Sequence, residues 1–190
     1  MKSILNCIFF ACFLFASVPA FSTEIRYGTV PSFELTDQNG KTVKSDNLKG
    51  KVWIADFIFT RCQTQCPLMS RQVAVLAQKL PDPNIKFVSF SVDPEHDTPK
   101  VLSAYAKEYG AKKGKWYFLT GDKTIIWNLA SDGFRLGVDS ASPEDLKEGA
   151  QPILHSSRFV LVDREGNIRG FFDSAEPEKL NELIQAAQQL

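Results

Sequence analysis

The chain of 190 residues has few side chains that bind metal ions or transfer protons, with four cysteines and two histidines. Its charge is balanced, with 22 Lys and Arg against 22 Asp and Glu. No basic stretch is dense enough to bind a phosphate backbone, so we expect no nucleic acid among its partners. No repeat, low-complexity tract or linker divides the sequence after its N-terminal segment. We therefore expect one domain, large enough to bury roughly two thirds of its unfolded surface.

The N-terminal segment has the composition of a targeting sequence. A lysine precedes an apolar run over residues 4–15, and Val18-Pro19-Ala20 resembles a cleavage site made of small residues. The run is short for a membrane-spanning helix, which needs about 20 apolar residues. We expect residues 1–22 to be a signal peptide, or an anchor that holds residues 4–21 in the membrane. Residues 23–190 would then form the exported domain.

Two cysteines remain in the exported part, Cys62 and Cys66, because the other two lie in the targeting segment. They follow the apolar run Lys51–Phe59, and Pro67 comes directly after the second. This pattern predicts a thiol pair carried from the end of a buried strand onto the first turn of a helix. Residues four apart on a helix share a face, roughly 5–6 Å apart at Cβ, so both sulfurs can reach one ligand. A helix N-terminus also favours the thiolate form.

Three interpretations of the thiol pair are open at this point. A structural disulfide would close a very short loop and stabilise the chain little. A redox pair usually has two residues between its cysteines, whereas three separate these. The third interpretation, which we favour, is a small metal site made of two thiolates and His155. Without the cysteines, a histidine beside an apolar strand would be read as a packing residue.

Thiolates and an imidazole suit copper, as Cu(I) or, with an added donor, Cu(II). Structural zinc normally takes four protein ligands, and the exported part has no third cysteine. A zinc site with three ligands and an open position is still compatible with the sequence. Copper is the metal we expect.

Strands and helices alternate along the exported part. The order predicts an α/β fold with a mixed central sheet flanked by helices. A thiol pair that opens a helix after the first long strand is the thioredoxin arrangement, so we expect a thioredoxin-like fold with an N-terminal hairpin and an inserted loop before a C-terminal hairpin. Periodicity and turn residues predict a hairpin over 33–43, strands over 51–59, 85–92 and 116–119, helices over 69–80, 99–109, 122–130 and 177–190, a loop over 137–153 with a helical turn at 143–146, and a hairpin over 157–172.

A second polar segment, Asp93–Pro99, follows a predicted core strand. Its last two residues, Thr-Pro, have the pattern of a helix cap and first helical position. Its carboxylates, Asp93 and Asp97, could orient the metal loop or shape a docking surface. We expect His96 to be a solvated loop residue, and Arg61, beside the first thiol, to hold a thiolate by its charge.

These segments together resemble the Sco/SenC family. The match runs in the right order across most of the exported part, and the combination is far more specific than any one segment. The residues that carry it are Asp56–Pro67, Ser91–Pro99, Leu119–Gly121 and His155 followed by Phe159–Asp163.

The resemblance implies a thioredoxin-like copper protein that faces the periplasm or, less readily, the equivalent mitochondrial compartment, the intermembrane space. It implies that Cys62, Cys66 and His155 are the copper ligands. Such proteins help to build the binuclear copper centre of cytochrome c oxidase, and some reduce the thiols of other copper-site proteins. We therefore expect a metallochaperone that delivers copper to the oxidase subunit with that centre. Other copper chaperones and thiol reductants are further expected partners.

One departure from the family pattern is Gln63, which stands where many members have proline. It bears on metal affinity and reduction potential rather than on the identity of the ligands. Two rival functions use the same thiols, Cys62 and Cys66: an exported thiol–disulfide oxidoreductase and a thioredoxin-fold peroxidase. A copper sensor or store with no delivery partner is a third.

Overall fold

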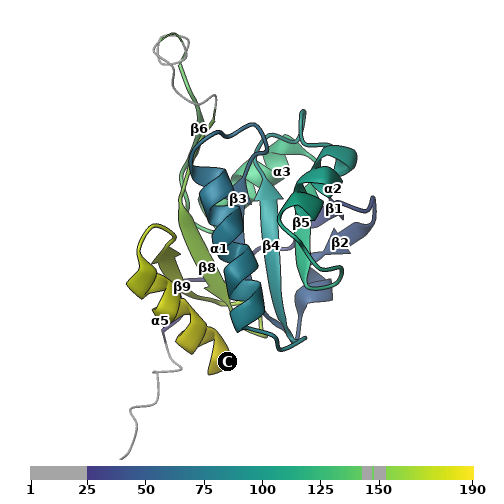
Figure 1. Cartoon of the computed structure of the whole chain (residues 1–190). Helices are drawn as coiled ribbons and strands as arrows, with labels where there is room; N and C mark the ends of the chain where they lie inside the picture. Colours follow the sequence, from purple (N-terminus) through teal and green to yellow (C-terminus); the bar gives the residue numbers. More distant parts are fainter. Residues whose placement is uncertain (1–24, 143–146, 148–152) are drawn as a thin grey trace, which may run out of the picture.

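The computed structural model describes residues 25–142, 147 and 153–190, so the predicted targeting segment lies outside the described residues. A seven-stranded sheet with the order β2-β1-β5-β4-β3-β8-β9 forms the centre of the domain (Figure 1). Strands β3, β4 and β5 are parallel, whereas β1 and β8 run antiparallel to their neighbours in this group. The strands are β1 (Glu34–Asp37), β2 (Thr42–Lys44), β3 (Val52–Ile58), β4 (Ile85–Ser91), β5 (Trp116–Thr120), β8 (Arg158–Val162) and β9 (Ile168–Asp173).

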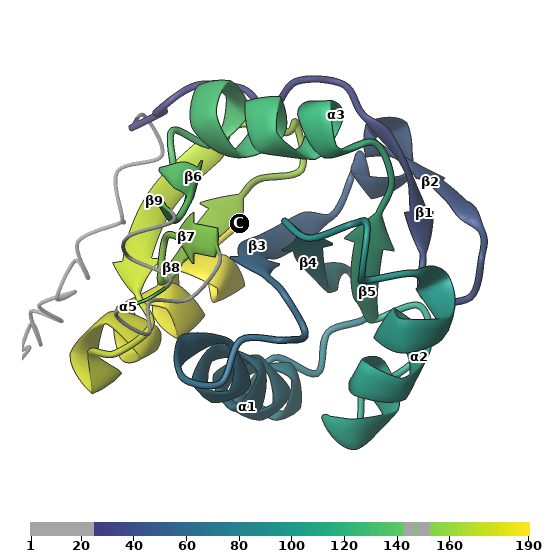
Figure 2. The same ribbon diagram turned by 90° about the horizontal axis from the view of Figure 1, so that it is seen from above.

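Helices cover both faces of the sheet. Helices α1 (Gln65–Lys79) and α2 (Pro99–Glu108) connect the parallel strands and lie on one face with α5 (Pro177–Gln188), while α3 (Lys123–Asn128) covers the other (Figures 1 and 2). No helix of the described part of the chain is long and apolar enough to cross a membrane. The expected thioredoxin-like architecture, with its N-terminal hairpin and mixed sheet, is confirmed.

The core explains why β3 is almost continuously apolar in sequence. Every residue of β3 is buried, because helices cover the strand on both faces. On the face that carries α3, the ring of Phe57 stacks on Phe90 at a centroid distance of 5.1 Å and meets Phe134 edge-on at 5.3 Å. On the opposite face α1 packs Met69 and Leu76 against the sheet.

Local signals place the start of α2 correctly. The Thr98 hydroxyl accepts a hydrogen bond from the backbone N–H of Val101 at 3.4 Å, and Pro99 takes the first helical position. The helix ends before Gly110, whose φ of 67° is a left-handed conformation that favours glycine. This cap accounts for the Thr-Pro pattern that ends the second polar segment.

Two predicted elements differ from the structure. Part of the expected loop over 137–153 forms a two-stranded sheet, in which β6 (Val138–Ser140) pairs with β7 (Ile153–His155). Pairs of such short strands have no periodicity to reveal them, and the helical turn expected at 143–146 lies outside the described residues. The helix expected over 122–130 ends at Asn128 and continues as a wider π-helical turn over Leu129–Gly133.

The parallel strands define two ends of the domain. Strands β3, β4 and β5 all point toward one end, and the loop that carries the cysteines leaves β3 there. The sheet of β6 and β7 rises at the same end (Figures 1 and 2). The opposite end holds the starts of the parallel strands and the C-terminus of α1.

Candidate metal centre

The two cysteines lie at the junction of β3 and α1, but the prediction that both stand on the first turn of the helix is wrong for Cys62. Cys66 is in the first turn of α1, and Cys62 is in the preceding turn rather than in the helix, where its N–H donates to the carbonyl of Phe59 at 3.2 Å. The two cysteines are not joined in a disulfide, and both are buried, with 6% of Cys62 and none of Cys66 exposed. Pro67 follows in the first turn, where its missing N–H has no intrahelical partner to lose.

Hydrogen bonds to its sulfur stabilise the thiolate of Cys62. The Cys66 thiol is its strongest partner, and the Cys62 Sγ also accepts the backbone N–H of Cys66 at 3.4 Å. These bonds, with further ones from Thr64, outweigh burial and lower the pKa of Cys62 to about 4. The pKa of Cys66 is raised, because its thiol donates to Cys62 and is itself buried. At neutral pH the pair therefore shares one proton, which Cys66 holds.

Asp97 fixes the chain just before the first cysteine. Its buried carboxylate accepts hydrogen bonds from the backbone N–H of Thr60 at 3.0 Å and from the Thr60 hydroxyl at 2.5 Å. It also accepts the Ser91 hydroxyl at 2.5 Å. Asp97 thus ties the end of β3, the end of β4 and its own loop together, and the segment that leads into the thiol turn is held in place.

Arg61 has a different role from the one the sequence predicts. Its guanidinium donates to the Asp93 carboxylate, with 2.9 Å from Nε and 2.6 Å from Nη2 to Oδ2. The expectation that Arg61 holds a thiolate by its charge is therefore wrong: the cation pairs with Asp93, and hydrogen bonds stabilise Cys62. The ion pair links the thiol turn to the loop after β4. About half of the Arg61 side chain is exposed, whereas the Asp93 side chain is buried.

A buried acid, Asp56, lies in the middle of β3. Its Oδ1 accepts the Ser89 hydroxyl at 2.6 Å, whereas Oδ2 is buried and has no hydrogen-bond partner among the described residues. Burial raises the pKa of Asp56 to about 7, and the Ser89 hydrogen bond offsets this only in part. Its negative charge contributes to the raised pKa of Cys66. Asp56 therefore couples electrostatically to the thiol pair from inside the sheet.

The third expected ligand, His155, is the last residue of β7, and its backbone pairs with Val138. Its side chain lies outside the described part of the chain. His96 is exposed in the turn after β4, as expected of a solvated loop residue, and its N–H donates to the carbonyl of Asp93. Among the described side chains, no three His, Cys, Asp or Glu residues are grouped as metal ligands. The described part of the site is the thiol pair.

Sequence reasoning missed the supporting residues Thr60, Ser91 and Asp56. An acidic residue inside an otherwise apolar strand is a signal that could have found Asp56. Thr60 and Ser91 gave no such signal, because their role depends on a carboxylate that folding brings from another segment. The soft donors, the low pKa of one thiol and the burial of both fit a thiophilic metal ion.

Comparison with known proteins identifies the family. The SCO1/SenC family model matches residues 23–189. A SCO1 protein homolog of Bacillus subtilis is 37% identical over 158 residues, which cover 82% of this chain and 79% of that protein.

Two solved structures extend the match to the fold. A SCO1/SenC family lipoprotein from Bacillus anthracis has a TM-score of 0.77 at 32% identity and covers 86% of this chain and 95% of its own. Bradyrhizobium japonicum ScoI, solved with copper bound, has a TM-score of 0.68 at 26% identity and covers 84% of this chain and 99% of its own. This chain belongs to the SCO1/SenC family.

Proposed function

We propose that the protein is a copper metallochaperone that takes up copper at Cys62, Cys66 and His155. It would deliver the metal to the binuclear copper site of cytochrome c oxidase during assembly of the enzyme. The observation that carries the proposal is the buried thiol pair, in which hydrogen bonds to its sulfur favour the thiolate of Cys62. Copper bound to the related ScoI supports the choice of metal.

The proton shared by the thiols defines the chemistry of uptake. Cys62 offers a thiolate directly, and it is the more exposed of the two residues. Cys66 has to lose its proton to bind, so uptake of one copper ion releases one proton at neutral pH. Delivery then proceeds by ligand exchange, as donors of the acceptor protein replace Cys62, Cys66 and His155.

We further propose that residues 1–22 direct the domain to the periplasm and are either removed or kept as a membrane anchor. The composition of this segment supports export. A related solved protein is described as a lipoprotein, which is consistent with attachment at a membrane.

Copper loading of the reduced domain, residues 23–190, tests the site. We expect one copper per chain after desalting, no retained copper in the Cys62→Ala, Cys66→Ala double variant, and weaker binding in His155→Ala. The matched control is His96→Ala, which removes the other histidine of the chain and should bind as the unchanged domain does. Full copper binding by the double cysteine variant would overturn the site.

A second candidate function, thiol–disulfide exchange, is favoured by the unlike pKa values of the two cysteines. A thiolate at Cys62 beside a buried thiol at Cys66 is suited to attack by the first and resolution by the second. An exchange catalyst should have a pair potential within about −120 to −270 mV and should turn over on a disulfide substrate. Rapid formation of a sulfenic acid at Cys62 with peroxide would instead support a peroxidase.

A further inference from the structure

A lysine-lined hollow lies at the end of the domain opposite the thiols. It has a volume of about 700 Å³ and is bounded by the C-terminal half of α1, the start of β4 and the loop between α2 and β5. Tyr109 supplies aromatic surface to it, whereas Trp116 lies in its wall with only 1% exposed. None of the described residues that line it is acidic, but Asp82 stands between the lining residues Pro81 and Pro83. Its cationic residues are Lys86, Lys112, Lys113 and Lys115.

Two of these lysines brace the walls of the hollow. The Lys86 ammonium donates to the carbonyl of Gly114 at 2.6 Å, and the Lys115 ammonium donates to the carbonyls of Leu80 at 2.7 Å and Asp82 at 2.5 Å. Burial lowers the pKa of Lys115 and the neighbouring charge of Lys86 lowers it further, while the charge of Asp82 offsets part of this effect. Two like charges are thus held close together beside one carboxylate, an arrangement that a bound anion would relieve further.

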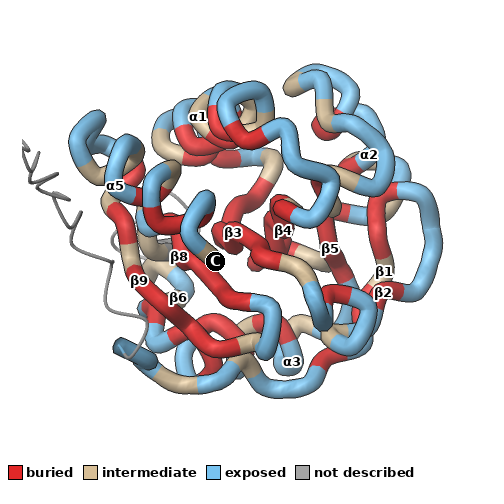
Figure 3. Tube along the Cα trace, turned by 90° about the horizontal axis from the view of Figure 1, so that it is seen from below, coloured by how far each residue is buried: buried red, intermediate tan, exposed pale blue. Residues whose placement is uncertain are grey.

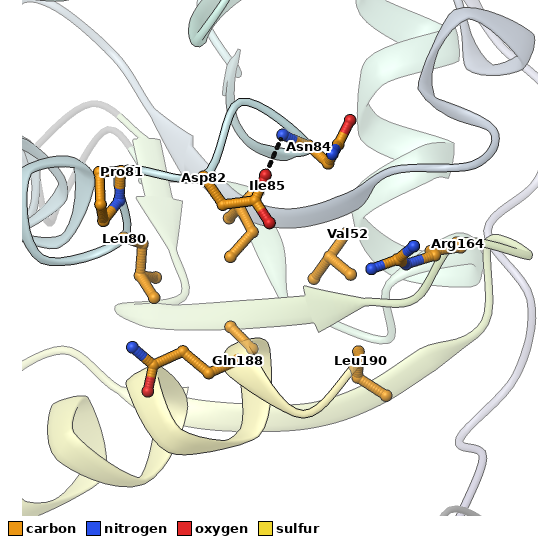
Figure 4. Close-up of a pocket in the computed structure, with 10 residues that line it drawn as sticks. Val52, Leu80, Pro81, Asp82, Asn84, Ile85, Arg164, Gln188 and Leu190 are labelled. Atoms are coloured by element: carbon orange, nitrogen blue, oxygen red, sulfur yellow. Dashed lines mark hydrogen bonds between the residues drawn. The ribbon is translucent and has the colours of Figure 1, made fainter.

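The other two lysines are available to a ligand. Lys112 and Lys113 are exposed, and neither forms an ion pair with any residue that the structure describes. An adjoining hollow of about 270 Å³, between the C-terminal ends of α1 and α5, has one cation, Arg164, and one acid, Asp82 (Figure 4). The chain as a whole has no net charge, so the four lysines of the first hollow are a local concentration of cations.

The N-terminal segment joins the domain at the same end. The backbone N–H of Tyr27 donates to the carbonyl of Ile168 at the start of β9, and Thr29 bridges to Asn167. The register of the sheet places the start of β9 beside the end of β8, and the end of β8 beside the start of β3. Figure 3 views the molecule from this end, where the turns that connect the strands are exposed. The cysteines lie beyond the opposite end of β3, which spans roughly 20 Å.

We propose that the lysine-lined hollow binds the phosphate group of anionic phospholipids, so that this end of the domain rests on a membrane surface. The two exposed ammonium groups of Lys112 and Lys113, the two cations in the wall and the ring of Tyr109 suit a headgroup with its glycerol. Each cation near an anionic surface adds to the attraction. The thiol pair then faces away from the membrane, toward soluble partners or the exposed part of a membrane protein. The proposal does not depend on the identity of the metal.

Vesicle co-sedimentation of residues 23–190 tests the proposal. Two solved relatives are folded proteins, and the region that matches this chain makes up 95% and 99% of them. We therefore expect residues 23–190 to fold without the N-terminal segment. We expect binding to vesicles that contain phosphatidylglycerol, weakening as salt is raised, and none to vesicles of phosphatidylcholine alone. The Lys112→Glu, Lys113→Glu variant should bind at least about tenfold more weakly, because two attractive charges become repulsive.

The matched control is the Lys100→Glu, Arg158→Glu variant, which makes the same change in net charge at the thiol end. Both of its positions are exposed, so we expect folding and vesicle binding to be retained. Equal weakening by the two variants would overturn the proposal, since attraction would then depend on net charge alone. The proposal would also be overturned if the domain bound a soluble acidic peptide or inorganic phosphate but did not bind anionic vesicles.

Discussion

The two ends of the sheet are both organised by a buried carboxylate, but with different donors. At the thiol end, Asp97 accepts hydrogen bonds from the amide and hydroxyl of Thr60 and from the hydroxyl of Ser91, which lie in separate segments. At the opposite end, Asp163 organises the turn between β8 and β9 and forms a buried ion pair with Arg169, 3.2 Å from Nη1 to Oδ2. The first arrangement fixes the position of a reactive loop, and the second compensates a buried charge.

The largest loss of stability is expected from Asp163→Ala. It would leave the guanidinium of Arg169, of which 5% of the side chain is exposed, without its carboxylate. We expect the free energy of unfolding to fall by about 4 kcal/mol, because a single buried charge remains. Urea denaturation measures this change. Copper stoichiometry of the folded fraction should be unchanged, and the Asp163→Leu, Arg169→Met pair should recover part of the loss.

Asp97→Ala is expected to destabilise the domain by about 3 kcal/mol, since three donors lose their acceptor in a buried site. Unlike the change at Asp163, it should also weaken copper binding, because Thr60 precedes the thiol turn. Copper titration of the folded protein measures the second effect, with Asp97→Asn as the milder control. A loss of stability with unchanged copper affinity would remove the distinction between the two ends.

The buried acid between the two ends, Asp56, predicts a dependence of stability on pH. Its pKa is raised to about 7 in the folded state, so ionisation opposes folding. The stability it contributes is complete below its unfolded pKa of about 4 and is lost as pH rises through 7. Between pH 6 and 8 this amounts to about 1.4 kcal/mol of lost stability. Urea denaturation of metal-free Asp56→Asn should show a flatter profile than the unchanged protein; equal slopes would contradict the assignment.

The smallest effect is expected from Arg61→Met, which removes the cation that follows Thr60 and precedes the first thiol. About half of the arginine side chain is exposed, so its pair with Asp93 should contribute about 1 kcal/mol or less. Thermal unfolding measures this loss. The reactivity of Cys62 toward an alkylating reagent at pH 6 should be unchanged, since hydrogen bonds lower the pKa of that thiol. A strong loss of reactivity would show that the charge of Arg61 also lowers the pKa of Cys62.

Much of the fold could be read from local pattern. The apolar run of β3 predicts a strand covered on both faces, and Thr98 with Pro99 fixes the start of α2. These signals lie within a few residues of the element they determine. The pair of short strands β6 and β7 gave no such signal, because their partners lie some fifteen residues apart and each strand has three residues.

The sequence by itself determined the thiol pair, its place between a buried strand and a helix, and the family to which the chain belongs. Only the tertiary structure decided which thiol carries the charge, because the pKa of Cys62 depends on donors that the turn brings to its sulfur. It also decided that Arg61 pairs with Asp93 and that Asp97 holds Thr60. These contacts join residues more than thirty positions apart, and their energies depend on burial and distance, which are properties of the folded chain.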